Sequence, residues 1–279
     1  MTISVNTNLF SLNAQRKLSQ SQSSLSTSMQ RLSSGLRINS AADDAAGLAI
    51  SQRMSAQVRG MNVAIRNAND GISLAQTADG ALSSVGDSLQ RMRELAVQSR
   101  NSTNSDSDKE SLDLEFSQLS DEIGRVLGGT TFNGKTILGA DAGTLTFQVG
   151  ANVTTNDSID IATTDLTADA LITTVTGASI GSAADATAIA TVITDIDAAI
   201  DDINSQRATF GASQNRFNSV VANLQTSVEN QSAASSRITD ADFAAETANM
   251  SRAQILQQAG TAMVAQANQL PQSVLRLLQ

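Results

Sequence analysis

The sequence predicts a mainly α fold: a long antiparallel helical coiled-coil bundle with a small β-hairpin region and with paired N- and C-termini. Three observations predict it. Apolar residues recur at coiled-coil spacing near both ends of the chain. Pro occurs once, so long helices meet almost no breaker. Phe is the only aromatic type present, which favours narrow helix–helix contacts over a wide core built on large rings.

Both ends of the chain carry apolar residues spaced seven apart. A second row accompanies each set, with Met29 and Leu36 near the N-terminus and with Gly260, Ala267 and Val274 near the C-terminus. A helix with two such rows needs a partner helix, from its own chain or from a neighbouring molecule. We therefore expect an assembly seam, formed by Leu18, Leu25, Leu32, Leu256, Met263, Leu270 and Leu277.

Two long helices are predicted between these ends. From about 44 to 99, apolar residues step alternately by four and three, and a helix of that length would span roughly 80 Å. From Ile189 to Leu224 a strict heptad indicates the second long helix. Arg207 and Gln214 interrupt its second row, and polar residues at such positions often fix the register of a coiled coil.

The pattern changes in the middle of the chain. A shorter helix is expected after the polar loop 101–107, ending at Gly128-Gly129. Asn133-Gly134 is a hairpin-turn signal, and alternating apolar residues follow it, so we expect a small β region at about 131–162. Residues 163–185 have no clear period and are expected to form a short connector.

The composition argues against catalysis. The chain contains no Cys and no His, which removes disulfides, imidazole bases, most zinc sites and any Ser-His-Asp or Cys-His site built within it. Asp43-Asp44 and Asp201-Asp202 do not converge, because adjacent residues of a helix point about 100° apart. We expect no enzyme activity, no cofactor and no metal.

Charge and hydropathy argue against nucleic acid and a membrane as partners. The net charge is −9, yet residues 1–60 carry six basic residues against two acidic ones, while residues 141–202 contain ten Asp and no basic residue. The acidic stretch argues against nucleic acid, and the basic end lacks interleaved aromatic residues. No apolar run is long enough to span a membrane, and the first residues do not resemble a Sec signal peptide.

Six strings carry a resemblance to a known family. They are Gln30–Asn39 (QRLSSGLRIN), Asp43–Gly47 (DDAAG), Leu89–Gln98 (LQRMRELAVQ), Phe132–Gly134 (FNG), Ile238–Thr247 (ITDADFAAET) and Val274–Leu278 (VLRLL). With these strings the chain resembles bacterial flagellin, in a short form that lacks large outer domains. The resemblance covers about 1–162 and 186–279.

The resemblance implies a domain organisation. Residues 1–43 and 237–279 would form a terminal coiled-coil core domain in the inner filament. Residues 44–162 and 186–236 would form the long-helix and β-hairpin domain of the outer shell, with 163–185 as a short variable connector.

The resemblance also implies partners. The chain would form a helical homopolymer in the extracellular flagellar filament and serve swimming motility. A flagellar export chaperone, the type III export apparatus, and the hook-junction and cap proteins would be partners, and the chain would be exported unfolded and fold on assembly.

The same resemblance implies a receptor contact at Arg91, Leu95 and Glu115, where flagellins are recognised by a vertebrate Toll-like receptor. The alternative is an ordinary helix face used in subunit packing. Three alternatives to a filament subunit remain: a hook–filament junction protein, a secreted enzyme built on a flagellin frame, and a non-flagellar coiled-coil scaffold.

Overall fold

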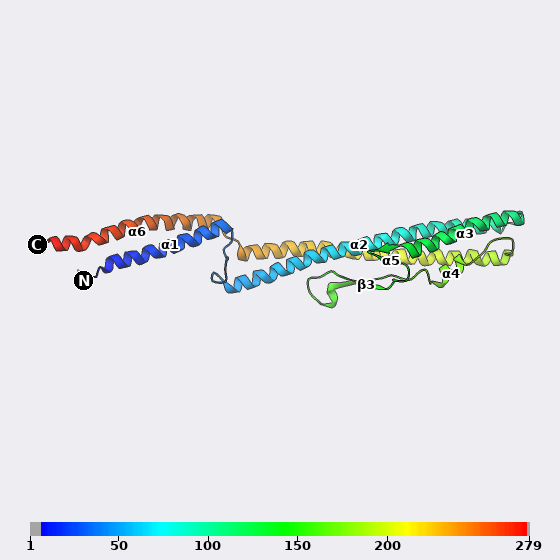
Figure 1. Ribbon diagram of the computed structural model, residues 1–279, viewed down its shortest axis with the longest axis horizontal. Helices are drawn as coiled ribbons and strands as arrows, with labels where there is room; N and C mark the ends of the chain where they lie inside the picture. The colour runs from blue at the N-terminus through cyan, green and yellow to red at the C-terminus, as the bar shows by residue number, and fades with distance from the viewer. Residues whose placement is uncertain (1–6, 278–279) are drawn as a thin grey trace. The chain divides into compact units, whose positions relative to one another are not determined.

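The computed structural model describes the backbone of residues 7–277 and the side chains of residues 7–269. Its elements, in chain order, are α1 (Leu9–Ser34), α2 (Ala45–Ser99), α3 (Asp106–Gly129), β1 (Thr131–Phe132), β2 (Lys135–Thr136), β3 (Thr144–Gln148), the 3-10 turn η1 (Thr155–Asp157), β4 (Ser158–Ala162), α4 (Ala170–Thr176), α5 (Ala186–Thr239) and α6 (Phe243–Leu277). Long helices with two small antiparallel strand pairs confirm the predicted mainly α fold (Figure 1).

The chain forms two compact units. One contains residues 1–56 and 230–279, and the other contains residues 57–229. These unit limits fall inside α2 and α5, whereas the limits expected from the sequence, 43/44 and 236/237, lie just before α2 begins and near the end of α5. The two units are described in turn.

The first unit is built on α1 and α6, which run antiparallel and side by side (Figure 1). Gly35 ends α1 with a left-handed φ of 73°, a conformation that glycine adopts without the steric cost of a Cβ. The two linkers that follow α1 and precede α6 form what we call the junction (residues 35–44 and 240–242). Leu36 pairs with Asp240 there, and the Ala241 amide donates to the Gly35 carbonyl at 2.9 Å.

The core of the second unit lies between α2 and α5. The α5 heptad supplies its large side chains, and Ile196, Phe210 and Phe217 are fully buried. The predicted polar interruption has a partner on α2, because Arg207 Nε donates to Asp79 Oδ1 at 2.8 Å. Such a polar pair between packed helices fixes which residues face each other along the seam.

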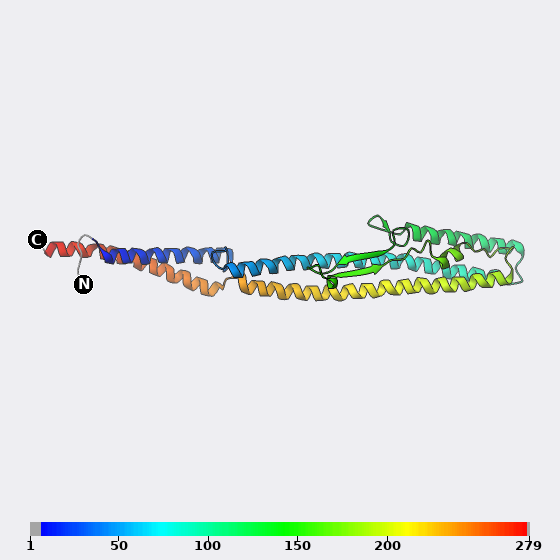
Figure 2. The ribbon, with the colours of Figure 1, turned by 90° about the horizontal axis from the view of Figure 1, so that it is seen from below.

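Two short hairpins follow α3. Asn133 and Gly134 occupy the β1–β2 turn with φ values of 50° and 80°, as a type I′ turn requires. The longer β3–β4 hairpin lies along the helices of the second unit (Figure 2). Its Ile159 and Ile161 are buried in the core.

An aromatic contact ties this hairpin to α5. The rings of Phe147 on β3 and Phe217 on α5 meet edge to face with centroids 5.6 Å apart. Phe217 in turn fills the space over Gly71 of α2, where an added Cβ would lie 2.7 Å from its Cζ atom. Three elements therefore meet at one phenylalanine, and Gly71 provides the room for it.

Residues 163–185 differ from the expected connector. They contain α4, and Leu166, Ile172, Val175 and Ile180 are all buried in the core of the second unit. Polar side chains of the helices hold the segment: the Ser120 hydroxyl donates to the Thr176 carbonyl at 2.8 Å, and Asp113 accepts from the Ile180 amide at 2.7 Å. Its buried apolar residues are spread over α4 and the loops around it, so they show no regular spacing from which their burial could be predicted.

The carboxylate of Asp202 on α5 lies in an unfavourable environment. Its Oδ2 atom is buried without a hydrogen-bond partner. Burial, reinforced by the charge of Asp169 at the start of α4, raises the pKa of Asp202, and a hydrogen bond from Gln206 opposes the shift. Because the folded pKa lies above the unfolded value, the ionised carboxylate lowers stability above the folded pKa, and this penalty disappears as the pH falls through it.

Gly71→Ala should lower the free energy of unfolding of the second unit by about 1–3 kcal/mol, because the new methyl group forces Phe217 out of its place. Gly80→Ala is the matched control on the same helix. Nothing lies within 4 Å of its added Cβ, so it should raise stability by about 0.5–1 kcal/mol. Urea denaturation followed by circular dichroism measures both, and equal effects would contradict the packing described.

Asp202→Asn should raise the urea midpoint at about pH 7, because it removes a buried charge and can keep the contact with Gln206. The gain should shrink as the pH is lowered to about pH 4, where the wild-type carboxyl is increasingly protonated. Asp201→Asn, at an exposed position next to it, is the control. A gain of the same size at both pH values would show that ionisation of Asp202 is not the cause.

Candidate functional site

The terminal helix pair is held by small and polar residues. On α1, the predicted seam residues Leu18, Leu25 and Leu32 are half-buried against α6. Ser11, one heptad before Leu18, and Ser28 are buried. On α6, the facing row is Ala253, Gly260 and Ala267. A Cβ on Gly260 would lie 3.1 Å from Leu18 Cδ1, so the two helices approach closely at this glycine.

Polar contacts fix the register of this pair. Asn8 Nδ2 donates to the Ala267 carbonyl at 2.7 Å, and the Ser11 hydroxyl donates to Asn268 Oδ1 at 2.8 Å. At the other end, Arg31 NH1 lies 3.9 Å from Glu246 Oε2. A neutral hydrogen bond adds only about 0.5–1.5 kcal/mol net, so these contacts align the helices more than they stabilise them.

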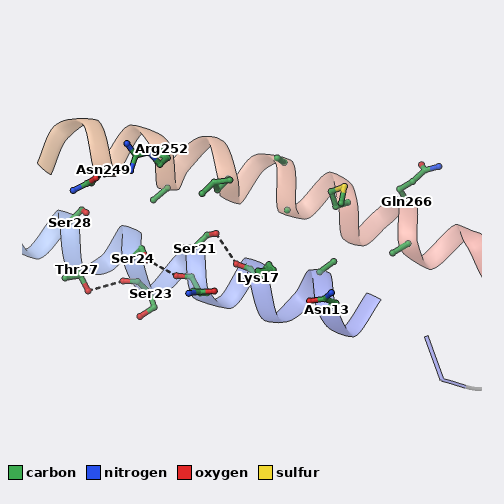
Figure 3. A pocket seen from close by; sticks show the side chains of 18 of the residues that line it. Asn13, Lys17, Ser21, Ser23, Ser24, Thr27, Ser28, Asn249, Arg252 and Gln266 are labelled. Atoms are coloured by element: carbon green, nitrogen blue, oxygen red, sulfur yellow. Dashed lines mark hydrogen bonds between the residues drawn. The ribbon is translucent and has the colours of Figure 1, made fainter. Parts of the chain in front are cut away.

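A groove runs along one face of the pair, and we call it the terminal groove. Its volume is about 1140 Å³, and residues three and four apart on both helices line it (Figure 3). Among them are three large apolar side chains that remain largely exposed: Phe10 at 57%, Leu256 at 51% and Met263 at 66%. Lining residues with helical spacing on two sides are the geometry that a third helix would complete.

The two predicted apolar rows of α6 lie on different sides of the helix. The second row, Gly260 and Ala267, faces α1, whereas Leu256 and Met263 of the predicted assembly seam do not pack against α1 and stay largely exposed. The physical reason is size, since small residues allow the helix backbones to approach and the larger residues then lie on the groove side. The side chains of Leu270 and Leu277 lie outside the described residues.

Three hydroxyl groups that line the groove on α1 are satisfied within the helix. The hydroxyls of Ser21, Ser24 and Thr27 donate to the backbone carbonyls of Lys17, Gln20 and Ser23, each at 3.0–3.1 Å (Figure 3). A neighbour can cover these residues without leaving a buried donor unpaired.

The second candidate surface lies on α2 and α3. Arg91 Nε donates to Glu115 Oε1 at 2.8 Å, and Arg91 NH1 donates to Glu94 Oε2 at 2.9 Å. The side chains of Arg91 and Glu115 are 48% and 45% exposed. The structure thus brings these two residues, predicted from separate helices, into one ion pair on the surface.

Leu95 does not share this surface. It is 1% exposed and belongs to the same core as Phe116 of α3. α3 covers a second face of α2 here, which the single apolar row on α2 did not indicate. Two exposed aliphatic residues were missed, Val97 and Leu114, and both fall outside the apolar rows of their helices, which is the signal that could have found them.

A capping box begins α3. Its Ser105 accepts from the Asp108 amide, and the Asp108 carboxylate accepts from the Ser105 amide at 3.0 Å. Among the described residues, no group of three His, Cys, Asp or Glu side chains is placed to hold a metal ion. No described helix is both long and apolar enough to cross a membrane.

Comparisons with known proteins identify the family. The model of the bacterial flagellin N-terminal helical region matches residues 5–142, and that of the C-terminal helical region matches residues 193–278. A flagellin of Halalkalibacterium halodurans is 46% identical over 274 residues, covering 98% of this chain and 99% of the relative. A flagellin of Bacillus subtilis is 43% identical over 303 residues, covering 98% and 99%.

Among solved structures, the crystal structure of Bacillus cereus flagellin is 36% identical with a TM-score of 0.49, covering 57% of this chain and 88% of that chain. The full-length relatives are named flagellin and belong to a structural family, which does not favour a hook–filament junction protein or a non-flagellar scaffold. The chain therefore belongs to the bacterial flagellin family and is a structural subunit that self-assembles into the helical flagellar filament for motility.

Proposed function

We propose that copies of the chain assemble through the terminal groove. The observation that carries this proposal is the exposure of Phe10, Leu256 and Met263 along a groove with helical spacing on both sides. Burying one large apolar side chain contributes about 1.5–3 kcal/mol, so a neighbouring helix that covers all three would gain more than the polar contacts within the pair supply.

Folding and assembly are coupled on this proposal. The α1–α6 pair fully buries serines and alanines between its helices and leaves Leu18, Leu25 and Leu32 only half-buried, so less apolar area is removed from water than a fully buried leucine seam would remove. Short or polar helices without such burial are marginal in water. The terminal segments, 1–43 and 237–279, then become stable as the inner part of the filament, with the long helices as the outer shell.

The family resemblance supports the remaining partners. The chain would pass unfolded through the type III export apparatus, guided by an export chaperone, and would meet hook-junction and cap proteins at the filament ends. Marginal terminal helices fit such a route, because a segment that folds only on assembly stays extended until then.

A second proposal is recognition of the monomer by a vertebrate Toll-like receptor through Arg91 and Glu115. Their ion pair presents a guanidinium and a carboxylate on the surface, with the exposed Leu114 next to Glu115 in sequence. Arg beside apolar area is typical of residues that dominate a protein–protein interface. Buried Leu95 would support the position of this turn of α2 rather than make the contact itself.

Leu256→Asp should abolish filament growth and leave the second unit folded. A charge covered by a neighbouring helix costs several kcal/mol, which raises the critical concentration for polymerisation more than about a hundredfold. Sedimentation of seeded polymer measures this, and circular dichroism should show the melting of the second unit unchanged. Leu256→Met conserves volume and should assemble normally. Filaments of normal stability from Leu256→Asp would exclude the groove as an assembly surface.

Arg91→Ala should weaken binding of the monomer to the receptor by about 1–3 kcal/mol, because it removes a charged group from a predicted contact centre. Arg125→Ala is the matched control, since Arg125 is also exposed and ion-paired, to Glu122 of its own helix. A reporter-cell assay and direct binding of purified monomer test both variants. Equal activity of Arg91→Ala and wild type would remove Arg91 from the proposal.

A further inference from the structure

The terminal groove carries positive charge that the terminal helices themselves do not balance. Glu246 is the only acidic residue within α1 and α6, against Arg16, Lys17, Arg31 and Arg252 in the described side chains. Three of these cations, Lys17, Arg31 and Arg252, line the groove together with Glu246. The groove is therefore basic in a chain whose net charge is −9.

Of the three cations that line the groove, Lys17 and Arg252 have no carboxylate partner within the part of the chain that the structure describes. Glu246 lies beside Arg31, and no ion pair forms at Lys17 or Arg252 among residues 7–269. Arg252 has only a long hydrogen bond, 3.4 Å, to Asn249 Oδ1 (both labelled in Figure 3). If another copy covered the groove with α1 or α6 alone, like charges would meet and both cations would lose water without gaining a partner.

The junction is net acidic and lies in the same unit. Asp43, Asp240 and Asp242 are exposed there and Asp44 is half-buried. Arg37 is the one basic residue of the junction, and its NH2 group donates to the Ile238 carbonyl at 2.6 Å. The Leu36–Asp240 pairing joins the two linkers that carry these residues. None of the ion pairs within the described part of the chain involves them.

Local hydrogen bonds hold these carboxylates in place. Asp242 Oδ1 caps α6, accepting from the Ala244 and Ala245 amides at 2.9 and 3.2 Å, and Asp240 Oδ2 accepts from the Ser236 hydroxyl at 2.6 Å. Amides of Ser40 and Asn39 lower the pKa of Asp43, which keeps its charge at neutral pH. Charges held in a fixed orientation lose little conformational freedom when a partner arrives.

We propose that the junction of one copy docks on the terminal groove of another, pairing Asp240 and Asp242 with Lys17 and Arg252. This inference rests on assembly through the groove and names the surface that fills its basic part. The two patches are different surfaces of the same chain, so the contact is head-to-tail, and such contacts propagate into an open helix when the rotation does not close.

A double-mutant cycle on the full chain tests the pairing. Lys17→Gln with Arg252→Gln removes the groove cations, and Asp240→Asn with Asp242→Asn removes the junction charges while Asn still caps α6. Each pair of substitutions should raise the critical concentration roughly tenfold, and all four together should raise it no further, because the lost interaction is the same one. Arg16→Gln is the control, a cation on α1 that does not line the groove, and should change it less than about twofold.

Two results would overturn the inference. One is an unchanged critical concentration in either double variant. The other is a quadruple variant whose increase in critical concentration equals the product of the increases in the two double variants. That result would mean that the cations meet some other surface, such as a terminal helix of another copy. Normal assembly of the Leu256→Asp variant would instead contradict the proposal that copies assemble through the groove, so failure of that proposal and failure of this inference are distinguishable.

Charge-reversed copies, Lys17→Glu with Arg252→Glu, should form filaments only when mixed with copies that carry Asp240→Lys and Asp242→Lys.

Discussion

The close approach of α6 to α1 determines how the terminal unit can behave. Ala253, Gly260 and Ala267 let the two backbones come together, and the buried residues of α1 include Ser11 and Ser28. The larger Leu256 and Met263 are left on the groove side, largely exposed. Because apolar burial is the main favourable term in folding, a pair with half-buried leucines on α1 and exposed large residues on α6 would, on the proposed assembly, draw much of its stabilisation from a neighbour.

The second unit has the same heptad spacing of apolar residues, but there the large residues are buried. Its α5 heptad places Phe210 and Phe217 inside, and the β3–β4 hairpin and α4 cover what two helices alone would leave exposed. The Arg207–Asp79 pair then fixes the register where the heptad is interrupted. Helix spacing is thus shared by both units, and the size of the residues in each row separates a self-sufficient core from an assembly surface.

This difference explains which features were predictable. The helix limits, the turn at Asn133-Gly134 and the Arg91–Glu115 surface follow from local signals or from the family strings. The burial of Leu95 was not predictable from one helix, because it depends on α3 covering a second face of α2. The packing of 163–185 depends on Ser120 and Asp113, far away in sequence, and which α6 row faces α1 depends on a comparison of volumes that periodicity does not contain.

A chain without His, Cys, Trp or Tyr has few side chains for specific recognition, so charge and helix spacing must supply it. On the proposed contact, Asp242 would have two tasks, because the carboxylate that caps α6 also meets the next copy. Its position depends on α6 being helical, and on the proposed coupling of folding and assembly α6 would be marginal until the groove is covered. An unfolded terminus would therefore present neither the oriented carboxylates nor the groove. Two unassembled copies would then have neither surface of the contact, so they would not associate prematurely through it. Assembly would begin only where a neighbour has already ordered one of the two surfaces.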